Sequence, residues 1–128
     1  MRASRFTAFR TLSLLSLLLC LTAPVQAQEV LTIEHAKGQT QVQKLPKTVA
    51  VLDWSTLDTM AVLGIEAQGI PTSGILPPML EQYADARFVR VGTLFEPDYE
   101  ALKNLKPDLI ILGRRAGGKY DEVANYGP

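Results

Sequence analysis

The chain has 128 residues, of which 47% are hydrophobic, with 13 basic and 13 acidic side chains. This length leaves room for one small domain rather than several. The balanced charge excludes a general attraction for nucleic acid or for anionic lipid.

The N-terminal segment has the three-part pattern of a cleavable signal peptide. Three arginines and no acidic residue come first, an apolar run from Leu12 to Leu21 follows, and Pro24 precedes a small-residue cleavage site at Ala27. The run of about 10 residues is too short to span a bilayer. We therefore predict a signal peptide at residues 1–27 and an exported, periplasmic protein at residues 28–128. Without the three arginines, 10 basic residues face 13 acidic ones, so this part is mildly acidic.

Cys20 is the only cysteine, and it lies inside the apolar run. A lipoprotein signal requires a small residue before its cysteine, whereas three leucines, Leu17 to Leu19, come before Cys20. We expect Cys20 to be removed with the signal peptide rather than lipid-modified. The exported part would then have neither disulfides nor thiolate chemistry.

The exported part begins with a predicted β-hairpin. Val30 to Glu34 and Gln41 to Leu45 each alternate apolar and polar residues, and Ala36 to Gln39 between them is turn-like. From Val49 onward, strand patterns alternate with helical patterns. The strands are expected at residues 49–52, 67–70, 88–91 and 109–112, the last being the most apolar and, we expect, the most buried.

The predicted helices follow from capping residues and prolines. Ser55 is expected to cap the first helix with Asp58 at its third position, and Gly64 to end it. Pro77-Pro78 opens a short second helix. Pro97 is placed in the first turn of a third helix, where Asp98 and Glu100 favour its positive end. A last helix is expected over residues 119–125.

Four successive strand–helix units predict an α/β fold: a parallel sheet in three layers with right-handed crossovers, preceded by the hairpin. In such sheets ligands bind at the loops that leave the carboxyl ends of the strands. The loops predicted there are Asp53 to Ser55, Pro71 to Ile75, Gly92 to Phe95 and Gly113 to Gly118.

The loop Gly113 to Lys119 has the highest density of candidate binding residues. Arg114 and Arg115 offer charged forks suited to anionic oxygens, although a solvated basic loop would look the same. The stretch also has the G-x-x-x-x-G-K spacing of a nucleotide-binding loop. Tyr120 stands where that motif requires Ser or Thr, and an exported protein meets no ATP supply, so a nucleotide-binding enzyme is the weaker alternative.

The other candidates have equally plain structural explanations. Asp53 and Trp54 either line a pocket or serve as loop polarity and packing, and Asp58 is explained by capping. His35, the only histidine, is expected to be an ordinary surface residue away from the ligand edge. Because no nucleophile has an evident base and no metal-ligand cluster exists, we predict neither an enzyme nor a metal site.

Several stretches resemble a known family. Val91 to Glu100, followed by Leu105 to Ile111, resembles the periplasmic iron–siderophore-binding proteins of ABC importers, and Leu57 to Gly64 also fits. The strand that ends in Gly113-Arg114 resembles their catecholate-type subgroup, the FatB-like proteins. The resemblance implies two α/β lobes with the ligand between them. This chain would supply only the first lobe, as a fragment or the product of a truncated gene.

The resemblance also implies roles for particular residues. Arg114 would face an anionic ferric chelate, with Arg115 as second choice and Thr93 as a further ligand-binding candidate. Glu100 would dock on arginines of the permease, although a helix N-terminal acid needs no such role. The ligand would be a ferric siderophore, with no cofactor and a monomeric receptor. The alternatives within this fold are haem, a corrinoid or a metal ion.

Overall fold

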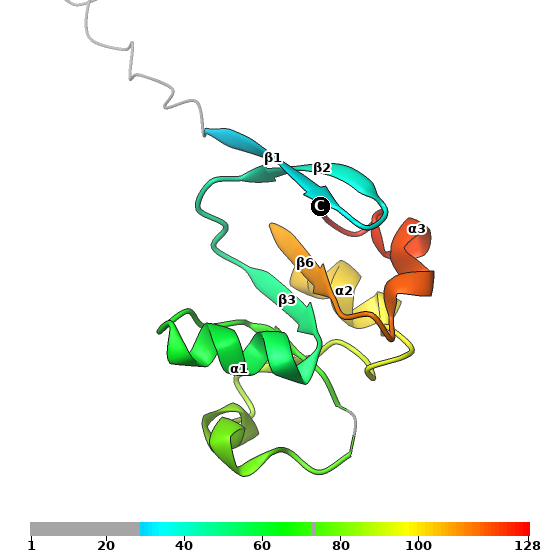
Figure 1. The fold of residues 1–128 in the computed structure, drawn as a ribbon. Helices are drawn as coiled ribbons and strands as arrows, with labels where there is room; N and C mark the ends of the chain where they lie inside the picture. Colours follow the sequence, from blue (N-terminus) through cyan, green and yellow to red (C-terminus); the bar gives the residue numbers. More distant parts are fainter. Residues whose placement is uncertain (1–28, 73) are drawn as a thin grey trace, which may run out of the picture.

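A four-stranded parallel sheet forms the centre of the molecule (Figure 1). The computed structural model describes residues 29–72 and 74–128, so the predicted signal peptide and Cys20 lie outside the described residues. The order across the sheet is β5-β4-β3-β6, which confirms the predicted parallel α/β fold. The strands are β3 (Val49–Leu52), β4 (Gly69–Ile70), β5 (Val89–Arg90) and β6 (Leu109–Leu112).

Strand β3 is buried on both faces of the sheet, as its uninterrupted apolar sequence predicts. Val49 and Val51 pack into one hydrophobic cluster, while Ala50 and Leu52 pack into a second cluster on the opposite face. None of the four residues is more than 4% exposed. Because successive side chains of a strand point to opposite faces, this one segment contributes to both cores.

Helices cover the two faces of the sheet, which confirms the three-layer arrangement. Leu57 of the first helix and Tyr83 of the second pack into the cluster of Val51, and Leu102 packs into the cluster of Leu52. In residues 29–72 and 74–128, no helix is long and apolar enough to cross a membrane. The helices are α1 (Trp54–Val62), the 3₁₀ helices η1 (Pro78–Ala84) and η2 (Gly117–Lys119), α2 (Tyr99–Leu105) and α3 (Tyr120–Val123).

The predicted cap of α1 is wrong. Asp53, not Ser55, is the N-cap: its carboxylate accepts hydrogen bonds from the Thr56 backbone N–H at 2.9 Å and from the Thr56 hydroxyl at 3.0 Å. Asp58 therefore lies inside the helix and caps nothing. The helix starts two residues earlier than predicted because β3 ends at Leu52 and the chain turns at once.

The start of α2 also differs from the prediction. Asp98 is the N-cap and accepts from the Ala101 N–H at 2.9 Å, so Pro97 precedes the cap instead of lying in the first turn. Lys106 ends the helix in the left-handed conformation, with φ of 52°. On the side of the helix that faces the core, Leu102 is fully buried, whereas Tyr99 and Leu105 are half-buried.

Strand β6 is not the most buried strand, contrary to the prediction. It forms an edge of the sheet, and each of its four side chains is only partly buried. At this strand the Ile110 N–H donates to the Pro128 carbonyl oxygen at 2.7 Å. The segment is as apolar as its sequence indicates, but the burial of its side chains is set by the place of the strand at the edge of the sheet.

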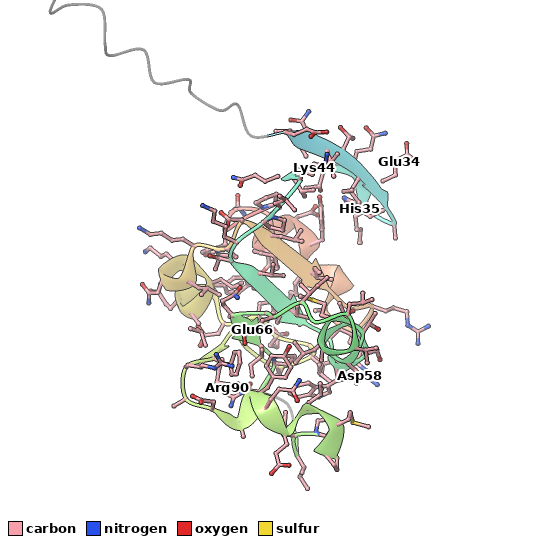
Figure 2. All side chains as sticks on the ribbon, turned by 90° about the vertical axis from the view of Figure 1, so that its left-hand side faces the viewer. Glu34, His35, Lys44, Asp58, Glu66 and Arg90 are labelled. Carbon is pink, nitrogen blue, oxygen red and sulfur yellow. The ribbon has the colours of Figure 1, made fainter. Side chains whose placement is uncertain are left out.

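The predicted hairpin is confirmed and lies at one end of the molecule (Figures 1 and 2). Strands β1 (Val30–His35) and β2 (Gly38–Gln43) pair antiparallel with a two-residue turn, tighter than the one predicted. The hairpin is joined to α3 by the Thr40 hydroxyl, which lies 2.8 Å from the Tyr120 hydroxyl. Figure 2 shows His35 on the hairpin, far from Asp58 and Arg90.

Substituting Asp53→Ala should lower the free energy of unfolding by about 1 kcal/mol, because the first turn of α1 loses its cap. Asp58→Ala is the matched control: it removes a carboxylate from the same helix without touching the cap, so we expect a change within about 0.5 kcal/mol. Urea unfolding measures both. A larger loss for Asp58→Ala than for Asp53→Ala would contradict the observed cap.

Candidate functional site

The four predicted loops leave the carboxyl ends of four parallel strands, so they emerge along one edge of the sheet. We refer to this edge, which is formed by the carboxyl ends of the strands and is not the side edge formed by β6, as the loop edge. β3 and β6 are neighbours, which brings Asp53 against Gly113 across 60 residues of sequence. A Cβ added at Gly113 would lie 2.7 Å from the Asp53 Cβ, so the Asp53 side chain packs directly against the glycine and leaves no space for a side chain there. Ser73, in the loop after β4, lies outside the described residues.

The first candidate residues, Asp53 and Trp54, are both engaged in the fold. The Asp53 carboxylate is the cap of α1, as described above. Trp54, the first residue of that helix, is half-buried and packs against the cluster that contains Val51. The structure thus shows the structural role of each side chain, capping for Asp53 and packing for Trp54, and neither of them lines the cavity described below.

Thr93 organises the tight turn between β5 and α2. Its hydroxyl oxygen accepts hydrogen bonds from the backbone N–H groups of Glu96, at 2.9 Å, and Phe95, at 3.2 Å. Its own backbone N–H donates to the Glu96 carbonyl oxygen at 2.8 Å. The turn needs glycine at position 92, where φ is 113° and an added Cβ would come within 2.7 Å of the Pro97 carbonyl carbon.

Arg114 and Arg115 follow β6 directly, and both side chains are exposed. The backbone beneath them is held by the Ala116 N–H, which donates to the Gly113 carbonyl oxygen at 3.1 Å, and by the fully buried side chain of Ala116. Neither arginine forms an ion pair with any acid in the described part of the chain. The predicted basic loop is thus a rigid turn that presents two uncompensated positive charges.

Two contacts join this basic loop to the turn after β5. The Lys119 ammonium lies 3.2 Å from a Glu96 carboxylate oxygen. The Arg115 guanidinium carbon lies 5.9 Å from the centre of the Phe95 ring, within the range of a cation–π contact. Because Lys119 is paired with Glu96, the lysine of the nucleotide-loop alternative already has an anionic partner within the fold.

A cavity of about 660 Å³ lies between the hairpin and β6 and reaches the loop edge at Arg114. Its walls are mainly apolar and come from strands β1, β2 and β6, with a smaller share of polar groups. The lining residues that matter below are His35, Thr40, Leu112, Gly113, Arg114 and Tyr120.

The prediction that His35 is an ordinary surface residue is wrong. It is half-buried on the cavity wall, with its ring centre 5.1 Å from that of Tyr120. Its Nδ1 accepts from the Lys37 backbone N–H at 3.2 Å, so its Nε2 carries the proton and lies 2.8 Å from the Thr40 hydroxyl. Sequence reasoning had no signal for this cluster because His35 and Tyr120 are 85 residues apart.

Glu100 is exposed on the second position of α2. Its neighbour Tyr99 faces α3 instead, where the Tyr99 hydroxyl donates to the Glu122 carboxylate and the ring stacks on Tyr126. Among the described residues, no three His, Cys, Asp or Glu side chains gather closely enough to hold a metal ion.

The resemblance found in the sequence is confirmed by comparison with known proteins. Residues 49–125 match the family model described as "Periplasmic binding protein". The petrobactin-binding protein YclQ of Bacillus subtilis is 37% identical over 79% of this chain and 33% of its own length. The ferric-anguibactin-binding protein FatB of Vibrio anguillarum is 29% identical over 77% of this chain and 30% of its own length.

Solved structures agree with this. The periplasmic catecholate-siderophore binding protein VctP from Vibrio cholerae is 37% identical, with a TM-score of 0.74 over 78% of this chain and 36% of that one. The present chain thus spans about a third of the relatives that it matches.

The contact between Tyr99 and Glu122 should make stability pH-dependent in the alkaline range. Accepting the hydroxyl proton in a hydrogen bond, the Glu122 carboxylate raises the pKa of Tyr99 from 10.0 to about 12. Since the folded pKa is the higher one, the stabilisation is complete below pH 10 and is lost as the pH rises toward 12. Tyrosinate absorbance and urea unfolding across this range measure the effect. In Tyr99→Phe the loss between pH 10 and pH 12 should shrink; an unchanged loss would contradict the assignment.

Proposed function

Because the chain belongs to the periplasmic binding protein family, we propose that it is the ligand-capturing component of an ABC importer, which binds a ferric siderophore and delivers it to the permease. Residues 1–27 are the proposed signal peptide, which directs the protein to the periplasm. Residues 28–128 are the proposed first lobe of a monomeric two-lobe receptor that works without a cofactor and catalyses no reaction.

The observation that carries this proposal is the pair of exposed arginines, Arg114 and Arg115, at the loop edge. Ferric siderophores of the catecholate type carry several negative oxygens around an iron that is already fully wrapped. Such a ligand needs cations and hydrogen-bond donors from its receptor rather than metal ligands. The guanidinium forks meet that need, and no acidic side chain of the described residues neutralises them.

The similarity to receptors named for petrobactin, anguibactin and catecholate siderophores supports the same ligand class. Within the proposed site, Arg114 is the first contact, because it both lines the cavity and belongs to a loop of the loop edge. Arg115 is the second, and Trp54 at the start of α1 is a further candidate contact. Asp53 and Thr93 contribute by fixing the loop backbones that present the ligand contacts.

Replacing Arg114 by alanine should weaken binding of a ferric tris-catecholate by tenfold or more. A charge-assisted hydrogen bond contributes about 1.5–3 kcal/mol, which corresponds to that loss. Quenching of the fluorescence of Trp54, the single tryptophan of this sequence, follows the titration.

Arg87→Ala is the matched control for this titration. Arg87 is also an exposed arginine, but its side chain is paired with Glu66 at 2.9 Å. It precedes β5, so it lies at the amino ends of the strands, opposite the loop edge. We expect its affinity to stay within about twofold of the unsubstituted protein, a change below about 0.5 kcal/mol. Equal affinities for Arg114→Ala and Arg87→Ala would refute the assignment of Arg114.

Glu100 is the proposed docking residue for the permease. It is exposed at the start of α2, and its carboxylate takes no part in the capping of that helix, which Asp98 performs. It is therefore free to meet a cation on a partner.

Charge reversal at this position, Glu100→Arg, should leave siderophore affinity within about twofold and lower the uptake of iron by cells at least fivefold, because like charges repel across an interface. Glu81→Arg, which reverses an exposed acid on η1, is the control and should support normal uptake. Normal uptake with Glu100→Arg would exclude this docking role.

A further inference from the structure

Phe95 is an exposed aromatic residue on the tight turn between β5 and α2. Its side chain is 59% exposed, whereas Phe88, the other phenylalanine among the described residues, is 4% exposed. Scattered apolar residues are common on protein surfaces, so exposure alone indicates nothing. What distinguishes Phe95 is the hydrogen-bonded backbone around it and the basic loop beside it.

The backbone around Phe95 is held on both sides. Its own N–H donates to the Thr93 hydroxyl, and Gly92 and Pro97 form an antiparallel bridge that closes the turn. Leu94, the preceding residue, is buried, so the two neighbours differ sharply in exposure. The hydrogen-bonded backbone of the turn therefore holds Phe95 at a position where its ring is exposed to solvent.

The ring also lies beside the basic loop. Arg115 is placed over Phe95 at 5.9 Å, and the ion pair of Lys119 with Glu96 ties the two loops together one residue further on. An aromatic face and a guanidinium are thus held side by side at the loop edge, from segments 20 residues apart in sequence.

We propose that Phe95 is a specificity-determining residue that stacks on an aromatic ring of the bound chelate, and that it selects aryl siderophores over aliphatic ones. This inference rests on the proposed function and names the ligand class for the same site. Offset or edge-to-face contact between aromatic rings adds attraction beyond simple apolar burial, and an adjacent cation favours a ring that carries anionic oxygens. An aliphatic carboxylate chelate such as ferric citrate would use the arginines but gain nothing from the ring.

Two variants of the full-length protein, expressed and processed as an exported protein, separate the contribution of the Phe95 ring from that of the arginines. Phe95→Leu removes the ring and keeps the apolar bulk, whereas Phe95→Tyr keeps a ring. The probes are the ferric tris complex of 2,3-dihydroxybenzoate and ferric citrate, titrated by fluorescence quenching. Met79→Ala, which shortens an exposed apolar side chain on η1, is the control for general surface effects.

We expect Phe95→Leu to weaken binding of the catecholate complex by about tenfold, and Phe95→Tyr to change it less than about threefold. Binding of ferric citrate should shift less than about twofold in every variant. Equal effects of Phe95→Leu on both probes, or no effect on the catecholate, would overturn the inference and leave the proposed function standing. If the unsubstituted protein binds neither probe, the proposed function itself fails, and that result is visible before any variant is compared.

Discussion

The structure depends on one strand that is buried on both faces. β3 contributes Val49 and Val51 to one core and Ala50 and Leu52 to the other, so both helical layers pack against the same strand. The same strand lies between β4 and β6 and sets the parallel direction of both. The direction of β3 therefore decides which edge of the sheet carries the loops and where a ligand can approach.

The loop edge is a consequence of that constraint. Neighbouring strands bring Asp53 to Gly113, with no space for a side chain between them. The turn after β5 and the loop after β6 are then joined through Lys119 and Glu96. Each loop contains its own internal hydrogen bonds, so the edge acts as a preorganised surface. Preorganised groups lose little conformational entropy on binding, which favours recognition by a few charged and aromatic side chains.

The sequence predicted what local patterns determine. The strands at residues 49–52 and 109–112, the hairpin and the glycine after α1 all follow from apolar runs and turn residues. The cap of α1 was missed because Asp53 and Ser55 both suit a cap, and the choice depends on where β3 ends. The burial of β6 and the cluster of His35 with Tyr120 depend on strand order and on contacts across 85 residues, which no local pattern contains.

The two arginines of the basic loop have different surroundings, and this difference bears on recognition. Arg114 lines a mainly apolar cavity, whereas Arg115 lies over an aromatic ring. A guanidinium that lies over a ring uses its face for that contact, while its N–H groups point outward along its edges. Arg115 can thus contact Phe95 and an anionic oxygen at once. A ligand whose anionic oxygens are attached to an aromatic ring satisfies both contacts in one approach, which an aliphatic carboxylate does not.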